Sequence, residues 1–359
     1  MEFWTTAVGL PGDVAEAAKK AEAQGWDGLG IPYAPLQAPD PYCCMTAAAL
    51  ATSTIKLGNW VATPASHTPA SAAGSIKTVQ AVSEGRAVFG LGRGDSALAY
   101  LGMSPAPLKF FEAYVQRVRN YLQEEAQPFD LDLDGGNHFP SVERLGLAQS
   151  AEEARFSLFM EGIDPVPLDM VGTGPKVLAI AARYADRITT AVGADPERVG
   201  WALDVVRQER EAGNVDRPVS LGAWVPVAVT DDIEAGRRML SGVTASMARF
   251  TAMHGKSVAP VSEGERKVYE SVHDAYQLRA HFQEGSPQSK EVPADFYDRF
   301  AIIGPADECI ERLNALVDLG IERFVVASPS PLTTPDLADK ALALFTNEVM
   351  PTVRAAEAN

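Results

Sequence analysis

The sequence predicts an α/β protein of one domain, a (β/α)8 TIM barrel with a helical insertion. Two observations predict this fold. Short apolar stretches alternate with helix-forming ones about every 30 residues, and such alternation is typical of parallel strands joined by helical crossovers. The chain also has 359 residues, which is long enough for eight strand–helix units. A doubly wound open sheet is the alternative that the same rhythm leaves open.

The first half of the chain shows the alternation most clearly. The run at 87–91 is short, apolar and followed by glycine, which indicates a strand buried on both faces. Asp40 can cap the second helix, and Pro41 suits its first position. We expect strands at residues 3–8, 29–31, 55–62 and 87–91, and helices at 13–23, 42–52 and 69–82.

The alternation resumes after an interruption. Residues 127–159 show few regular signals and predict an irregular excursion that contains a hairpin, and residues 231–299 exceed a crossover helix and predict a helical insertion at the carboxyl-end face. The remaining strands are expected at 167–171, 185–190, 219–229, 300–303 and 324–327, and the remaining helices at 107–125, 177–184, 196–211, 305–319 and 336–347. We count eight core strands among these stretches, within a single domain of residues 1–359.

Composition excludes several classes of function. The formal net charge is −16 and no long basic run is present, which argues against nucleic acid and anionic membranes as partners. Three cysteines form no disulfide framework, and no apolar run reaches the ~18 residues of a membrane span. We therefore expect a cytoplasmic protein. The histidines lack the spacing of a zinc site, so no metal is predicted.

The first candidate site follows the run at 87–91, where Gly94 and Asp95 stand just past a strand end. In a parallel barrel, residues at that position line the mouth of the active site. Asp95 is therefore a candidate acid. The alternative is that Asp95 only caps the helix that follows.

Two further candidates lie past other strand ends. Gly172-Thr173-Gly174-Pro175-Lys176 is a strand-to-helix junction, where free amides of the first helical turn can bind phosphate. Thr173 can add a hydroxyl and Lys176 a charge; a tight turn without a ligand is the alternative. His67 follows the third strand and is placed to face the mouth, although a structural histidine would give the same pattern.

Taken together, five stretches resemble the bacterial luciferase-like superfamily, and within it the oxidoreductases similar to methylenetetrahydromethanopterin reductase. Only one of the five stretches, L-G-R-G-D-S-A-L-A, is specific when taken alone. They are A-P-D-P-Y at 38–42, A-A-A-L-A-T-S-T-I-K-L-G at 47–58, L-G-R-G-D-S-A-L-A at 91–99, G-P-K-V-L-A-I-A-A-R-Y-A-D at 174–186 and I-G-P-A-D-E-C-I-E-R-L at 303–313.

This resemblance implies a dimeric barrel that uses coenzyme F420 or FMN at its mouth. It implies a non-prolyl cis peptide after the third strand, matching the bond between Trp60 and Val61. Where many relatives carry an acidic or histidine-containing motif, this chain has I-P-Y-A-P at 31–35, so Tyr33 is the candidate hydrogen-bond or proton donor there. The cofactor-binding candidates are Trp60, Val61, Thr63, Gly94, Gly172, Thr173, Gly174, Lys176 and Thr190, and the catalytic candidates are Asp95, Tyr33 and His67.

The resemblance implies an F420-dependent oxidoreductase that transfers a hydride between the deazaflavin and a small organic substrate. Relatives that bind a sugar phosphate use a lysine that is absent from residues 190–193 here, which argues against glucose-6-phosphate. The first alternative is an FMN-dependent monooxygenase that receives its reduced flavin from a partner flavin reductase. The second is a barrel that binds a flavin or another ligand without catalysis. In each case we expect a homodimer.

Overall fold

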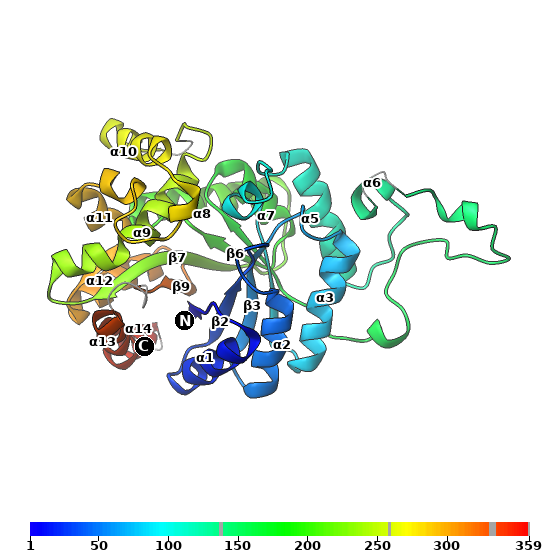
Figure 1. Cartoon of the computed structure of the whole chain (residues 1–359), viewed down its shortest axis with the longest axis horizontal. Coiled ribbons are helices and arrows are strands. Elements are labelled where there is room, and N and C mark those ends of the chain that lie inside the picture. Colours follow the sequence, from blue (N-terminus) through cyan, green and yellow to red (C-terminus); the bar gives the residue numbers. More distant parts are fainter. Residues whose placement is uncertain (136–138, 258–259, 330–334, 358–359) are drawn as a thin grey trace.

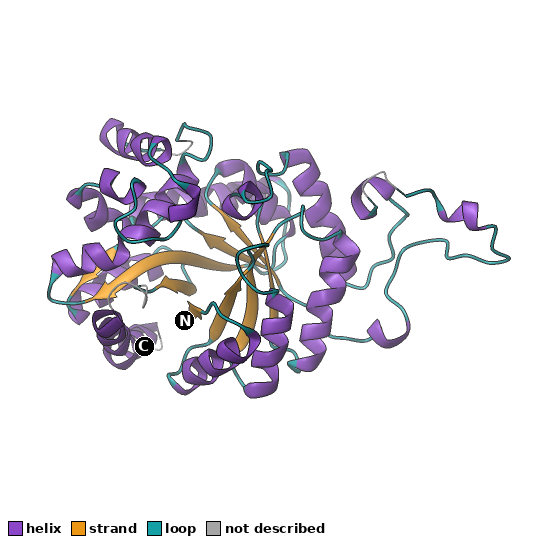
Figure 2. Cartoon of the chain, in the orientation of Figure 1, coloured by secondary structure: helices purple, strands orange, loops and turns teal. Residues whose placement is uncertain are grey.

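The structure is a computed structural model that describes residues 1–135, 139–257, 260–329 and 335–357. Its strands gather at the centre and most helices surround them (Figure 1, Figure 2). The strands are β1 (Glu2–Thr6), β2 (Gly28–Pro32), β3 (Lys56–Ala62), β4 (Ala87–Leu91), β5 (Leu168–Gly172), β6 (Arg187–Thr190), β7 (Ser220–Val229), β8 (Ile302–Gly304) and β9 (Arg323–Ala327).

Helices follow the strands along the chain. The α-helices are α1 (Pro11–Ala23), α2 (Pro41–Ala51), α3 (Pro69–Val82), α4 (Ser96–Ala99), α5 (Leu108–Leu122), α6 (Leu131–Asp134), α7 (Pro175–Tyr184), α8 (Pro196–Ala212), α9 (Ile233–Thr251), α10 (Glu263–Asp274), α11 (Ala294–Phe300), α12 (Ala306–Val317), α13 (Pro335–Leu344) and α14 (Met350–Glu357). Single turns of other helix types are η1 (Val142–Leu145), η2 (Leu158–Met160), η3 (Leu278–Ala280), η4 (Gln288–Glu291) and the π turn η5 (Phe345–Val349).

Eight parallel strands close a ring in the order β1-β2-β3-β4-β5-β6-β7-β9, and β9 pairs back with β1. The closed ring confirms the predicted (β/α)8 barrel and excludes the doubly wound sheet. β8 stands outside this ring and pairs with the end of β7. The sequence placed a strand at 300–303, but Phe300 ends helix α11, where its ring stacks on Phe296 at 5.2 Å.

Large side chains fill the inside of the barrel. Trp4 and Trp60 stack with ring centroids 5.8 Å apart and form an apolar cluster with Val88 and Val325. This packing requires glycine on the neighbouring strand, because a Cβ at Gly28 would overlap the Trp4 indole. The glycines of the strands thus make room for tryptophans in the middle of the barrel.

Charged side chains fill the amino-terminal end of the barrel, opposite the mouth. Asp169 and Arg323 are fully buried, and their Oδ2 and Nη2 atoms lie 3.0 Å apart. Arg187 lies beside Asp169 and pairs with Glu2 at 2.8 Å. Burial would raise the pKa of Glu2, but Arg187 and Lys56 outweigh that effect and lower it. The sequence analysis did not identify this network.

The end of the chain differs from the prediction. The last helix was expected to end at 347, but α13 continues through the π turn η5 into α14 as far as Glu357. Pro351 normally marks a helix break because it lacks an N–H donor. Here Pro351 directly follows the π turn, in which the Met350 N–H donates to the Phe345 carbonyl five residues back, and such a π turn interrupts the regular i→i−4 ladder beside the proline.

The excursion leaves the barrel between α5 and β5 and extends away from it (Figure 1). Its described residues contain only the short helices α6, η1 and η2, none of which has a buried residue. Gln127 and Ala154 form one isolated antiparallel bridge. The hairpin expected in this segment is therefore absent from the described residues, because single-turn helices take the place of paired strands.

The predicted insertion contains α9, α10 and α11, which pack into a second apolar cluster together with Ala228 of β7 and Ile303 of β8. In this cluster the Tyr269 ring lies 5.2 Å from that of Phe296. It connects β7 with β8, so it starts and ends at strand ends on the mouth side. Among the residues that the structure describes, no helix is both long and apolar enough to cross a membrane.

Candidate active site

The carboxyl ends of β2 to β6 bring most of the predicted site residues to one face. Because these strands are parallel and paired in sequence order, Tyr33, Thr63, Asp95 and Thr173 each follow a strand end at the same rim. Helix α7 starts at this rim, so Lys176 lies there as well, although its side chain is exposed.

Tyr33 and His67 form a hydrogen-bonded pair past β2 and β3. The Tyr33 hydroxyl lies 2.8 Å from Nδ1 of His67, and the Tyr114 hydroxyl donates to the His67 carbonyl at 2.9 Å. Tyr42 packs edge-on against the His67 ring at 5.7 Å. Burial raises the pKa of Tyr33, so its phenol keeps its proton at neutral pH. The pair can therefore donate a proton or a hydrogen bond to a bound molecule.

The third strand ends in the expected cis peptide, between Trp60 and Val61. Beyond it the Thr63 hydroxyl lies 2.9 Å from that of Ser66. The Nε1 atoms of Trp60 and Trp224 are buried, and neither has a hydrogen-bond partner within the described part of the chain. Trp224 packs against the same interior cluster as Trp60. A buried donor without an acceptor calls for an explanation such as a bound ligand.

Asp95 does not cap the helix that follows it. It occupies the N-cap position of α4, but its side chain makes no capping hydrogen bond. The carboxylate instead forms an ion pair with Arg249 of the insertion, with both side chains largely buried. The Arg249 guanidinium also lies over the Tyr276 ring at 4.2 Å. Asp95 therefore attaches the insertion to the rim of the barrel, which corrects the capping alternative.

The last turn of α9 covers one side of the mouth. The Phe250 carbonyl accepts a hydrogen bond from the Thr173 hydroxyl at 3.2 Å, and the Phe250 ring lies 6.4 Å from Trp224. Arg249 is the preceding residue, so two adjacent residues connect α9 with β4, β5 and β7. The sequence analysis missed both, because these contacts join residues far apart in the chain and no local pattern marks them.

His281 reinforces this attachment. Its Nε2 lies 3.2 Å from the Ser96 hydroxyl, and its Nδ1 forms a hydrogen bond with the Tyr276 hydroxyl. Burial, together with the nearby Arg249 charge, lowers the pKa of His281 to about 3. The imidazole is therefore neutral in the folded protein at any pH above that value.

We expect acid to weaken the folded state through His281. An unfolded histidine takes up a proton below pH ~6.5, whereas the folded one stays neutral until about pH 3. This contribution to stability is complete above pH ~6.5 and is lost as the pH falls toward 3, at up to ~1.4 kcal/mol per pH unit. Urea unfolding at pH 5, 6 and 7.5 measures it. His281→Gln should flatten the pH dependence and His254→Gln, at an exposed site, should not; equal slopes in all three proteins would contradict the assignment.

The remaining candidates are placed as follows. Gly174 is the N-cap of α7 in an extended conformation, and Pro175 fills the first position of that helix. Thr190 is buried, and its hydroxyl donates to the Gly222 carbonyl at 3.2 Å. Gly94 has a φ of +93° at the turn before Asp95. Across the described residues, no group of three potential metal ligands is present.

Known proteins match the chain over most of its length. The family model of the luciferase-like monooxygenases matches residues 4–323. The 5,10-methylenetetrahydromethanopterin reductase of Methanolobus tindarius is 25% identical over 321 residues, which are 88% of this chain and 90% of the relative.

Two solved structures share the fold at lower identity. The coenzyme F420 dependent tetrahydromethanopterin reductase of Methanopyrus kandleri has a TM-score of 0.72 at 19% identity, with 98% of this chain and 99% of that chain covered. A type II Baeyer-Villiger monooxygenase of Pseudomonas putida in complex with FMN has a TM-score of 0.66 at 16% identity, with 98% of both chains covered. With its family match and its closed barrel, the chain belongs to the luciferase-like monooxygenase family and is an oxidoreductase.

Proposed function

We propose that the protein is an F420-dependent oxidoreductase that transfers a hydride between the deazaflavin and a small organic substrate. The observation that carries this proposal is the match over 88% of the chain to a methylenetetrahydromethanopterin reductase. The solved tetrahydromethanopterin reductase of Methanopyrus kandleri, which shares the fold, is named as coenzyme F420 dependent. When bound, the deazaflavin would supply or accept the hydride.

The tryptophan cluster inside the barrel fits a planar ring with polar edges. The buried Nε1 groups of Trp60 and Trp224 have no protein acceptor in the described residues, and the carbonyl or nitrogen acceptors of such a ring would satisfy them. Val61 and Val171 pack against the same cluster and offer apolar contact. The N-terminus of α7 would hold the phosphate arm, since helix amides of the first turn attract anions.

Residues of the protein would exchange the proton with the substrate and hold helix α9 over the mouth. We assign proton exchange with the substrate to Tyr33, whose phenol is held by His67. Asp95 would act through Arg249, by keeping the last turn of α9 over the mouth. Thr173 would help to keep the last turn of α9 in place, because its hydroxyl donates a hydrogen bond to the Phe250 carbonyl.

A titration tests the cofactor assignment. The purified protein is titrated with F420 and with FMN in parallel, while tryptophan fluorescence is followed. We expect F420 to bind with micromolar or lower Kd and FMN at least tenfold more weakly. A preference for FMN would instead favour an oxygen-dependent monooxygenase. Saturation by neither would overturn the oxidoreductase assignment for this site.

Gly174→Val should weaken cofactor binding at least tenfold. Gly174 is extended, so valine is allowed by the backbone, but its branched side chain would stand at the amides that we assign to the phosphate. The same titration measures the effect. Gly12→Val is the control, because Gly12 lies at the start of another helix, α1, and a Cβ there meets nothing within 4 Å. Unchanged binding in a folded Gly174→Val protein would remove the phosphate site from α7.

A further inference from the structure

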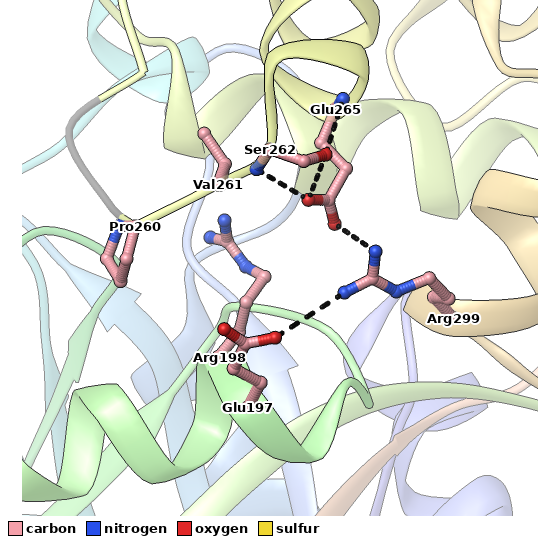
Figure 3. Close-up of a pocket in the computed structure, with 7 residues that line it drawn as sticks. All are labelled: Glu197, Arg198, Pro260, Val261, Ser262, Glu265 and Arg299. Atoms are coloured by element: carbon pink, nitrogen blue, oxygen red, sulfur yellow. Dashed lines mark hydrogen bonds and ion pairs between the residues drawn. The ribbon is translucent and has the colours of Figure 1, made fainter.

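A cavity lies outside the barrel, between helices α8, α10 and α11. It has a volume of about 360 Å³. We call it the α8–α10 pocket; its lining residues are Glu197, Arg198, Pro260, Val261, Ser262, Glu265 and Arg299 (Figure 3). None of these residues belongs to the candidate active site, and the oxidoreductase reaction gives the pocket no role.

Arg198 is the unusual residue of this pocket. Only 2% of the residue is exposed to solvent. Nε donates to the Val192 carbonyl at 3.3 Å and Nη2 to the Thr251 hydroxyl at 3.1 Å, but Nη1 has no partner among the described residues. In Figure 3 the guanidinium points across the pocket toward Val261 and Ser262. A buried donor aimed into a cavity indicates that an acceptor belongs there.

The charges around the pocket leave Arg198 without a carboxylate. Arg299 forms ion pairs with Asp195 at 2.6 Å and with Glu265 at 3.2 Å, and it lies 4.0 Å from Glu197 (Figure 3). The acids at the rim are thus engaged by a single arginine. No ion pair joins Arg198 to any acid in the part of the chain that the structure describes. The guanidinium lies 5.0 Å from the Tyr269 ring, but a buried cation that no acid neutralises is costly, so an anion in the pocket would stabilise it.

Two helix ends add to this preference. Glu197 and Arg198 lie in the first turn of α8, and Ser262 is the N-cap of α10, where its side chain and that of Glu265 form a capping box. Both helices have 12 residues or more, so each directs the positive end of its dipole toward the cavity. Asp195 already caps the first turn of α8 and Glu265 that of α10, so the buried cation contributes most of the preference for negative charge.

We propose that the α8–α10 pocket binds a small oxyanion, a carboxylate or a phosphate group, through Nη1 of Arg198. The site is independent of the cofactor proposed above. Carboxylate and phosphate both offer the paired acceptor oxygens that suit a guanidinium. The pocket is large enough for a small metabolite that carries such a group, and the rim carboxylates of Glu197 and Glu265 disfavour a more highly charged polyanion.

Calorimetric titration of the full chain tests the proposal. Sodium phosphate and sodium acetate are titrated separately at an ionic strength held constant with sodium chloride. We expect saturable binding of at least one of them, and the stronger of the two identifies the group. Arg198→Gln should weaken that binding at least tenfold. Arg207→Gln removes the same charge from the same helix at an exposed position, and it should change the binding less than twofold.

A second variant keeps the test decisive if Arg198→Gln does not fold. Val261→Trp would fill the pocket without changing any charge, and it should abolish binding while the circular dichroism spectrum and Tm are retained. Absence of saturable binding for both anions would overturn the proposal, as would binding that Val261→Trp leaves unchanged. Phosphate binding that is lost in Gly174→Val and retained in Val261→Trp would belong to α7 and would equally overturn it.

Discussion

Asp169→Asn and Arg323→Met should each lower the free energy of unfolding by about 3–5 kcal/mol, the cost expected when one partner of a buried ion pair is removed. Both side chains are fully buried, and the two charged atoms are 3.0 Å apart. Burial already lowers the pKa of Arg323 to about 10, although the Asp169 charge opposes this effect. Either substitution leaves charge in the barrel interior with less compensation than before.

The double variant distinguishes the effect of breaking the ion pair from the effect of changing the side chains that fill this space. Asp169→Asn combined with Arg323→Met should cost less than the sum of the single changes, because no uncompensated charge is then created at this pair. Urea unfolding at pH 7 gives all four free energies. Arg183→Met is the control, since its partner acids Glu112 and Glu209 are about one-third exposed and a pair of that kind contributes about 1 kcal/mol or less. Strict additivity, or single effects as small as the control's, would contradict the prediction.

The buried network shows why the sequence predicted the fold better than the interior. Periodic apolar stretches and glycine turns are local signals, and they placed the strands of the ring within a few residues. Asp169 occupies an apolar strand, and nothing nearby in the sequence shows that Arg323, from the last strand of the ring, neutralises it. Register across a closed barrel determines that contact.

The same contrast between local signals and long-range contacts holds for the residues of the candidate site. His67 and Asp95 were predicted because each follows a strand end, which is a property of the local sequence, and Tyr33 was predicted from the family resemblance. Arg249 was missed, because its pairing with Asp95 spans 154 residues and depends on how the insertion folds over the rim. A single sequence contains the residues of such a contact but no signal that joins them.

Tyr33→Phe should lower kcat at least a hundredfold and change the Kd of the cofactor less than threefold. A positioned proton donor contributes about 10²–10⁴-fold to a rate, whereas the phenyl ring that remains keeps the packing of Tyr33 against Tyr42 and His67. The measurement is anaerobic turnover of F420 with the first small alcohol or carbonyl compound found to react. The cofactor Kd comes from tryptophan fluorescence.

Tyr42→Phe is the matched control for this prediction. Tyr42 is as buried as Tyr33 and its ring lies 6.4 Å away, but its hydroxyl has no hydrogen-bond partner among the described residues. Loss of that hydroxyl should change kcat less than threefold. If both variants lose turnover equally, the cluster acts by packing and Tyr33 is not the proton donor. If Tyr33→Phe loses cofactor affinity as much as turnover, the phenol holds the ring in place, and the proton must come from another residue at the mouth.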